Sequence, residues 1–265
     1  MATIEGGAFG DFLHGTSKAD AIFGGGGNDV IFSGGGKDIV YGEDGDDLLF
    51  GGSNDDTMFG GTGHDTIFSG SGEDTIFGGD DGDTIFSGSG DDYVLGEGGD
   101  DVIFSGSGSD YVDGGDGDDL LNTGAGDDFV LGGDGNDSIS TGSGDDLVEA
   151  GEGDDTVFTG SGDDYIDGGA GNDTLSSGSG NDVFVFNGGG GQDVVLDFHP
   201  GSDLLQIASN INGLPVSSPA DLAGNVSSDV DGNAVLDLGN GDTVTLVGVD
   251  AQEVQDSPDS FIVVV

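Results

Sequence analysis

Aspartate recurs every nine residues along most of this 265-residue chain, and this period constrains the fold more than any other feature. The step is unchanged from Asp11 to Asp182. Two residues after each Asp stands an aliphatic residue, Met or Phe, and Gly usually stands two and four residues before it from Asp29 onward. A unit this short, repeated without insertion, predicts a solenoid in which each repeat stacks on its neighbours.

Elementary geometry assigns a shape to one repeat. The three residues centred on the aliphatic position form a short strand, with one side chain inward and two outward. The Gly-rich part turns tightly, because Gly reaches positive φ at low cost. One repeat is therefore half a coil, and turns that begin with Ser87-Gly88 or Thr141-Gly142 mostly alternate with turns such as Gly132-Gly133. We predict an all-β fold, a parallel β-roll with two nonapeptide repeats per coil.

The charge balance indicates a cation as the partner of this roll. Asp and Glu number 54 against two lysines, Lys18 and Lys37, which gives a formal net charge of -52. Self-repulsion of this size opposes a compact state, and it excludes nucleic acid as a ligand. Clustered carboxylate and carbonyl oxygens suit Ca²⁺, and there is no Cys for a thiolate site. Because each coil buries only two aliphatic side chains, we expect the metal to supply much of the folding free energy.

Together with Gly60 before it, the segment Gly61-Thr62-Gly63-His64-Asp65-Thr66-Ile67-Phe68 follows the pattern G-G-x-G-x-D-x-U-x, where U is the aliphatic residue. With such repeats from residue 24 to residue 185, the chain closely resembles the RTX (repeats-in-toxin) calcium-binding proteins secreted by type I systems. The resemblance implies a right-handed β-solenoid in which Ca²⁺ binds between stacked turns, through Asp carboxylates and Gly carbonyls. It gives predicted pairs such as Asp29 with Asp47, Asp65 with Asp83, Asp74 with Asp92, and Asp164 with Asp182.

The resemblance carries the metal-ligand role onto one Asp in each repeat, with about sixteen Ca²⁺ in all. The Ca²⁺ ions would bring the net charge from -52 to about -20. The predicted ligands are Asp29, Asp38, Asp47, Asp56, Asp65, Asp74, Asp83, Asp92, Asp101, Asp110, Asp119, Asp128, Asp137, Asp146, Asp155, Asp164, Asp173 and Asp182.

Departures from the pattern define the ends and the weaker positions of the predicted roll. Weaker sites are expected where Asn54 or Asp81 stands two residues before the repeat Asp, and where Glu43 or Glu97 stands four before it. The repeats of Asp11 and Asp20 lack most turn glycines, so we expect residues 1–23 to form an N-terminal cap rather than calcium sites. Residues 24–185 are the predicted roll.

Residues 186–265 are predicted to form a small C-terminal β cap. Residues 193–198 and 203–207 alternate like strands, and 234–238 and 243–247 read as a hairpin with Asn240-Gly241 in its turn. The segment resembles the C-terminal domain of serralysin-type proteases. Its last residues, 259–265, resemble the uncleaved signal of type I secretion; the alternative is a last strand of the cap. With no classical signal peptide at the N-terminus, we expect a secreted, extracellular protein that engages type I secretion machinery.

No catalytic constellation stands out, so we expect a protein that is not an enzyme. The histidines, His14, His64 and His199, are far apart in the sequence, and the H-E-x-x-H motif of a zinc protease is absent. The repeat itself accounts for the many carboxylates.

Aromatic residues follow the aliphatic position in the N-terminal half, for example Phe23, Phe32, Tyr41 and Phe50. They predict a ladder on each face, either stacked within the molecule or serving as a contact surface for self-association or a membrane. The first functional hypothesis is a secreted calcium-binding protein with a structural, adhesive or cell-surface role. The second is a membrane-active, pore-forming protein, since the layout is similar to that of the secreted nodulation protein O of rhizobia. The third is a separated export module of a larger RTX enzyme.

Overall fold

The computed structural model describes residues 1–265 and is all-β, a parallel β-solenoid with a small antiparallel segment near the C-terminus, as the period predicts. The chain divides into two compact units, Met1–Asp134 (unit 1) and Gly135–Val265 (unit 2). Each unit is described by itself.

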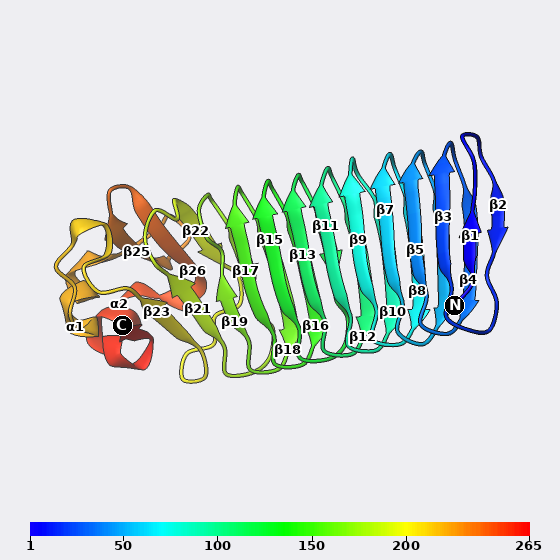
Figure 1. Cartoon of the computed structure of the whole chain (residues 1–265). Coiled ribbons are helices and arrows are strands. Elements are labelled where there is room, and N and C mark those ends of the chain that lie inside the picture. The colour runs from blue at the N-terminus through cyan, green and yellow to red at the C-terminus, as the bar shows by residue number, and fades with distance from the viewer. The chain divides into compact units, whose positions relative to one another are not determined.

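In unit 1 the chain passes alternately through two parallel sheets, and each strand pairs with the strand two further along the chain (Figure 1). The register is a constant eighteen residues, as in Ile67↔Ile85 and Ile85↔Ile103. One sheet contains β1 (Thr3–Glu5), β3 (Ala21–Gly26), β5 (Ile39–Asp44), β7 (Thr57–Thr62), β9 (Thr75–Asp80), β11 (Tyr93–Gly98), β13 (Tyr111–Asp116) and β15 (Phe129–Asp134). The other contains β2 (Phe12–His14), β4 (Val30–Gly35), β6 (Leu48–Ser53), β8 (Thr66–Ser71), β10 (Thr84–Ser89), β12 (Val102–Ser107) and β14 (Leu120–Asn122).

Most strands are longer than the three residues expected. β8, for example, has six residues, because Ser69, two positions beyond the aliphatic Ile67, also points inward and is buried. Each of these strands thus has two inward positions rather than one; the second carries a side chain in β8 and is Gly60 in β7. The aliphatic side chains are confirmed as the apolar part of the core, since each one from Ile22 to Val130 is fully buried. The second inward position is a small residue because the turn begins there.

The aromatic ladder is confirmed as intramolecular stacking. In the sheet of odd-numbered strands, the Tyr41 ring lies 4.9 Å from the Phe23 ring and 4.7 Å from the Phe59 ring, with planes within 4° of parallel. In the other sheet, Phe50 stacks on Phe32 at 4.5 Å. The rings cover one another's faces and leave their edges toward solvent. Stacking at the strand spacing stiffens each sheet.

Unit 2 has the same winding and also contains the cap. One sheet contains β17 (Leu147–Glu152), β19 (Tyr165–Asp167), β21 (Val183–Phe186), β23 (Leu204–Ile207) and β27 (Ile262–Val264). The other contains β16 (Ser138–Ser143), β18 (Thr156–Ser161), β20 (Thr174–Ser176), β22 (Gln192–Val195), β26 (Asp242–Asp250), β25 (Asn233–Gly239) and β24 (Val226–Ser228). Parallel pairing extends past residue 185, because β22 pairs with β20 and β23 pairs with β21.

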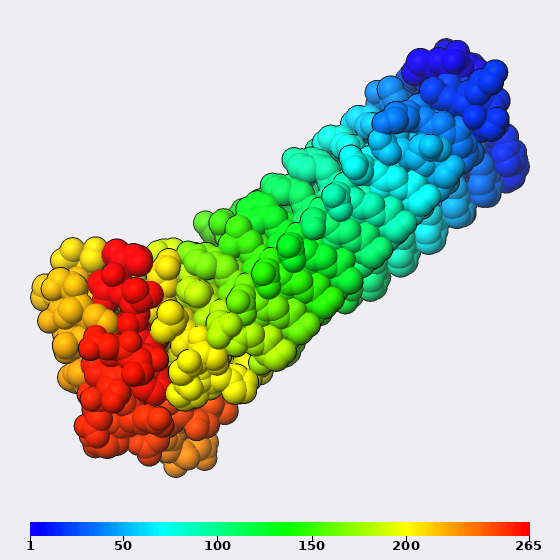
Figure 2. Space-filling model, turned by 90° about the horizontal axis from the view of Figure 1, so that it is seen from below, coloured from blue at the N-terminus to red at the C-terminus, as the bar shows by residue number.

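The predicted hairpin is confirmed: β25 and β26 are antiparallel, and Asn240 and Gly241 both have positive φ in its turn. The strand predicted over 193–198 ends earlier, at Val195, and Leu196 is exposed. The last residues form a strand, since β27 pairs with β23. Figure 2 shows the residues beyond about 200, in yellow to red, packed together beside the last coils of unit 2.

Short helices complete the cap: η1 (Ile211–Gly213), α1 (Pro219–Leu222), η2 (Ala223–Asn225), α2 (Ala251–Asp256) and η3 (Pro258–Ser260). Asp250 caps the N-terminus of α2 by accepting a hydrogen bond from the backbone of Gln252. None of these helices has the length and apolar character needed to cross a membrane.

Candidate metal centre

The repeat aspartates form two rows, one along each edge where the chain turns between the sheets. In unit 1 the first row contains Asp11, Asp29, Asp47, Asp65, Asp83, Asp101 and Asp119, and the second contains Asp20, Asp38, Asp56, Asp74, Asp92, Asp110 and Asp128. In unit 2 the first row contains Asp137, Asp155, Asp173 and Asp193, and the second contains Asp146, Asp164, Asp182 and Asp203. All eighteen predicted ligands are in these rows, and all are buried, with 1–3% of each residue exposed.

The predicted pairs are neighbours, and they meet through a backbone-to-carboxylate hydrogen bond. The N–H of Asp29 donates to Oδ1 of Asp47 at 2.7 Å, and that of Asp65 donates to Oδ1 of Asp83 at 2.7 Å. The pairs Asp74–Asp92 and Asp164–Asp182 repeat this contact at 2.8 and 3.0 Å. One oxygen of each carboxylate therefore locks the stacking of consecutive coils.

In many of these aspartates the other oxygen, Oδ2, receives no hydrogen bond. A buried carboxylate oxygen without a donor or cation is costly, because ionised oxygens lose their hydration. The buried Oδ2 atoms that receive no hydrogen bond belong to Asp29, Asp38, Asp47, Asp56, Asp65, Asp74, Asp83, Asp92, Asp101, Asp110, Asp155, Asp164, Asp173 and Asp182. Such a row of unsatisfied anionic oxygens fits a bound cation.

In the first row of unit 1 a carbonyl oxygen stands beside each such carboxylate. A Cβ placed on Gly42 would lie 2.4 Å from Oδ2 of Asp47 and 2.4 Å from the carbonyl oxygen of Gly60 in the next coil. Gly60 repeats the arrangement, with Oδ2 of Asp65 at 2.4 Å. Gly therefore leaves open a cradle where a carboxylate and a backbone carbonyl converge. These are the hard oxygen ligands that Ca²⁺ takes.

In the second row a hydroxyl mostly fills the equivalent place. Ser69 Oγ donates to the carbonyl of Ser87 at 2.6 Å, and Ser87 Oγ donates to the carbonyl of Ser105 at 2.9 Å. A serine hydroxyl has one proton, which goes to the carbonyl, so Oδ2 of Asp74 stays without a donor. The two rows thus share the unsatisfied carboxylate and differ in what surrounds it.

The sequence pattern of the RTX calcium-binding nonapeptide repeat matches this chain over residues 5–40, 33–67, 41–76, 77–112, 113–148 and 149–184. The chain belongs to the RTX calcium-binding nonapeptide repeat family. Its repeats thereby imply calcium as the ligand, and the donor set described above fits that ion. No curated protein matches the chain.

Two solved structures are similar to this RTX chain. The extracellular lipase LipA from Serratia marcescens has a TM-score of 0.33 and 18% identity, over 76% of this chain and 40% of the lipase. The AlgE6R3 subunit of the Azotobacter vinelandii mannuronan C5-epimerase has a TM-score of 0.33 and 26% identity, over 55% of this chain and 78% of that subunit. This chain therefore spans less than half the length of the lipase.

Without a bound cation, burial raises the pKa of several repeat carboxylates and so favours their protonated form. Burial, aided by the charges of Asp65 and Asp101, raises the pKa of Asp83 to about 8. Burial likewise raises the pKa of Asp56 and of Asp173 to about 7, and neighbouring repeat carboxylates add to each shift. Each shift has the same meaning: near neutral pH the ionised form needs a positive partner.

The ends of the rows are closed by protein donors instead. At the N-terminus, Oδ2 of Asp20 accepts hydrogen bonds from the backbone N–H of Thr16 at 2.7 Å and from its hydroxyl at 2.8 Å. Oδ2 of Asp11 accepts from the backbone of Gly7 at 2.6 Å. Protein donors thus satisfy the Oδ2 atoms at this end, and that residues 1–23 are a cap rather than calcium sites stays a prediction.

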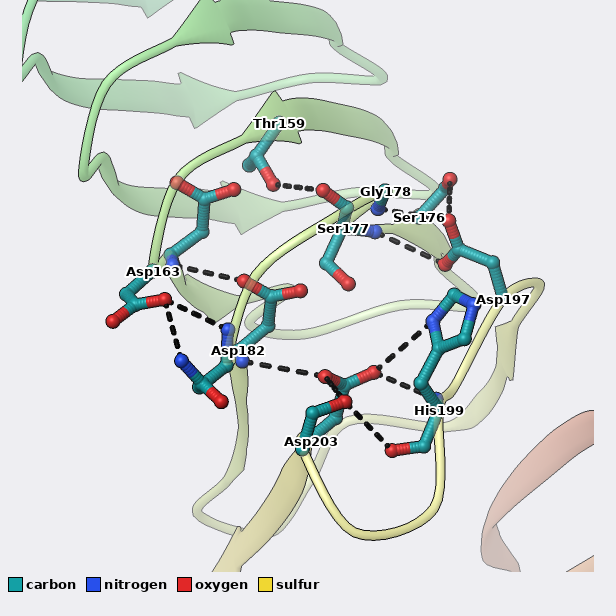
Figure 3. Close-up of polar contacts among 12 residues, drawn as sticks. Thr159, Asp163, Ser176, Ser177, Gly178, Asp182, Asp197, His199 and Asp203 are labelled. Atoms are coloured by element: carbon teal, nitrogen blue, oxygen red, sulfur yellow. Dashed lines mark hydrogen bonds and ion pairs between the residues drawn. The ribbon is translucent and has the colours of Figure 1, made fainter.

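At the C-terminal end of the second row, Asp203 follows Asp182 (Figure 3). The N–H of Asp182 donates to Oδ1 of Asp203 at 3.4 Å, and the N–H of His199 donates to its Oδ2 at 2.7 Å. Asp197 closes the same end by accepting hydrogen bonds from the backbones of Ser177 and Gly178.

Sequence reasoning missed two members of these rows, Asp193 and Asp203. The N–H of Asp173 donates to Oδ1 of Asp193 at 3.1 Å, which continues the first row. The signal was present: Gly188–Leu196 reads G-G-G-G-Q-D-V-V-L, a complete nonapeptide displaced by a two-residue insertion. Asp203-Leu204-Leu205 keeps only the D-x-U part.

Where another residue replaces a turn glycine, the backbone keeps the conformation of the regular repeats, which strains that residue. Glu43, Asn54, Asp81 and Glu97 all have positive φ, between 70° and 78°. L-residues are strained in this region, and Glu more than Asn. The turns therefore hold their shape without Gly, and the expectation that these calcium sites are weaker stays a prediction.

Proposed function

We propose that the chain is a secreted calcium-binding protein that folds when it meets extracellular Ca²⁺ and then serves a structural or adhesive role at a cell surface or in a matrix. The supporting observation is the row of buried Oδ2 atoms that no donor of the chain reaches, in Asp83 and its equivalents. Ca²⁺ at these turns would replace the hydration that the carboxylates lose on folding. Each predicted ligand would then hold two successive coils together.

The same chemistry supports an export route through a type I system, with residues 259–265 as its signal. When free calcium is low, as in the cytosol, the uncompensated charge of -52 favours the unfolded, threadable chain. Extracellular calcium modules bind at roughly 10⁻⁴ to 10⁻³ M, so folding would follow emergence. About sixteen Ca²⁺ are proposed for the whole chain, one for each stacked pair of repeats.

A structural role is proposed over catalysis and over membrane insertion. The repeat carboxylates take part in the stacking of coils, and the three histidines lie in separate segments, His14 in β2, His64 before β8 and His199 before β23. The stacked rings from Phe23 to Phe77 in one sheet, and from Phe32 to Phe104 in the other, use their faces on one another. This supports the aromatic ladder as an element that stiffens each sheet.

Far-UV circular dichroism during a calcium titration of the full chain tests the proposal, with Mg²⁺ as the control. We expect a cooperative transition from coil to β-structure near millimolar Ca²⁺ and little response to Mg²⁺, which demands shorter and more regular coordination. A spectrum that is already β-rich in excess chelator and does not respond to calcium would overturn the proposal.

A further inference from the structure

A small, partly open cavity of about 10 Å³ lies in unit 2 where the last turns of the first row meet the cap. That volume holds about one water-sized guest. Its lining comes from the roll at Gly168 and Asp193, from the loop at Gly190, and from the hairpin at Leu238 and Asp242. The cavity therefore joins residues that are far apart in the sequence.

Two carboxylates line this cavity and each has an oxygen to spare. Asp193 is 4% exposed; its Oδ1 accepts from the N–H of Asp173, and no donor reaches its Oδ2, which lies beside Gly190. Asp242 uses Oδ2 to accept from the backbone of Gly189 and from Nδ2 of Asn212, both at 2.8 Å, and leaves Oδ1 without a donor.

The cavity stands where the repeat pattern loses a ligand. Beside Gly42, a carboxylate oxygen and the carbonyl of the next coil converge. Beside Gly168, Oδ2 of Asp173 is again present and again unsatisfied, at 2.6 Å from a Cβ placed on this glycine. No carbonyl of the next coil is among the nearest neighbours there, because the two-residue insertion before Asp193 displaces that turn. Asp242 is the oxygen donor that the cap brings to this gap.

No Lys or Arg side chain can neutralise the carboxylates at this cavity. The chain has no Lys after Lys37 and no Arg, so unit 2 contains neither. Asp167, which is also close, is held by hydrogen bonds from Gly169 and Asn187. The positive charge must come from solution, and an all-oxygen donor set selects a hard divalent cation.

We propose that this cavity is a cation site of the calcium class in which Asp193 of the roll and Asp242 of the cap bind the same ion. The site rests on the proposed calcium-dependent folding and adds a latch to it: the ion fastens the antiparallel hairpin β25–β26 to the last turn of the first row. The cap would then close only after the roll has taken up calcium.

Native mass spectrometry of the full chain in calcium counts the bound ions and tests the latch. We expect Asp242→Asn and Asp193→Asn each to bind one Ca²⁺ fewer than the parent chain. Asp231→Asn is the matched control, because Asp231 is an exposed cap residue that does not line the cavity. An unchanged count in both cavity variants would overturn the proposal and leave a bound water as the occupant.

Hydrogen exchange of the same proteins locates the effect. With both proteins folded at a calcium concentration of 100 times the Kd of the cavity site, exchange of residues 188–191 should be about 100-fold slower in the parent chain than in Asp242→Asn. Residues 66–71 of β8 should be protected by calcium in both proteins. If β8 gains no protection in any protein, calcium-dependent folding itself fails; if only the difference at 188–191 is missing, the latch alone is wrong.

Discussion

Asp83, inside the first row, and Asp20, at the start of the second, are both buried and both accept a backbone hydrogen bond on Oδ1. They differ at Oδ2, which has no partner in Asp83 and two donors from Thr16 in Asp20. The same residue at the same place in a coil thus either needs a cation or is satisfied by the chain. The difference teaches that the surroundings of Oδ2, rather than the Asp itself, mark a calcium ligand.

Acid should replace calcium in the interior of the rows, and this is the largest effect we expect. Burial raises the pKa of Asp83 to about 8 and that of Asp56 to about 7, above the unfolded value near 4. Groups shifted upward stabilise the folded state at low pH and lose that contribution as pH rises through the folded pKa. In excess chelator, β-structure should therefore increase as pH falls from about 8 to 5.

Circular dichroism against pH, with and without calcium, measures this effect. In millimolar Ca²⁺ the β signal should stay level over the same range, because the ion takes the place of the proton. A chelated chain that stays unfolded at pH 5 would show that the Oδ2 atoms are not the source of its instability.

Replacing a single interior carboxylate should have opposite effects with and without calcium. In calcium, Asp83→Asn removes a carboxylate ligand and leaves the positive charge of the buried Ca²⁺ without its partner. We expect this to lower the free energy of unfolding by about 3–5 kcal/mol. In chelator the same change removes an uncompensated buried charge and should stabilise the roll.

Asp20→Asn is the matched control, measured with Asp83→Asn by denaturant unfolding in calcium and in chelator, at the highest pH at which the chelated parent still folds, so that Asp83, whose pKa is about 8, is still partly ionised. Since Oδ2 of Asp20 only accepts hydrogen bonds from Thr16, this variant should lose a smaller amount of stability, and the same amount in both solutions. If calcium changed the stability of both variants by the same amount, an Asp inside a row would not differ from one at its end, and the comparison would be wrong.

The nine-residue period was sufficient to predict the register of the strands and the burial of side chains such as Ile85, because both depend on spacing alone. The membership of Asp193 was missed because two inserted residues shift it out of phase, although Gly188–Leu196 keeps the motif. Asp242 could not be predicted from any repeat. It reaches the end of the row through the pairing of β26 with β22, which is a long-range contact of the cap.

The longer strands have a similar explanation. The motif shows which residue is aliphatic, but the second inward position is held by Gly, Ser or Thr, which carry no hydrophobic signal. Only the fold reveals that Ser69 is buried and that its hydroxyl bridges to the next coil. The distinction between the Gly-lined first row and the hydroxyl-lined second row was visible in the sequence only as an alternation of turn types.

The smallest effect that we expect concerns the glycines that line the first row of aspartates. A methyl group at Gly60 would stand 2.3 Å from the carbonyl of Gly78 and 2.4 Å from Oδ2 of Asp65, so it would push apart two oxygens of one cradle. The fold tolerates Ala at the equivalent Ala150, which is fully buried, so Gly60→Ala should fold. We expect a loss of about 1 kcal/mol, the lower end of overpacking costs, seen as a higher calcium midpoint in the dichroism titration.

Gly98→Ala is the control for this change, because a Cβ on Gly98 meets no atom within 4 Å. Its calcium midpoint should match that of the parent chain. If the two alanine variants behave alike, the glycine of the first row serves the backbone of the turn and not the space beside the carboxylate, and the two rows are then equivalent toward calcium despite their different linings.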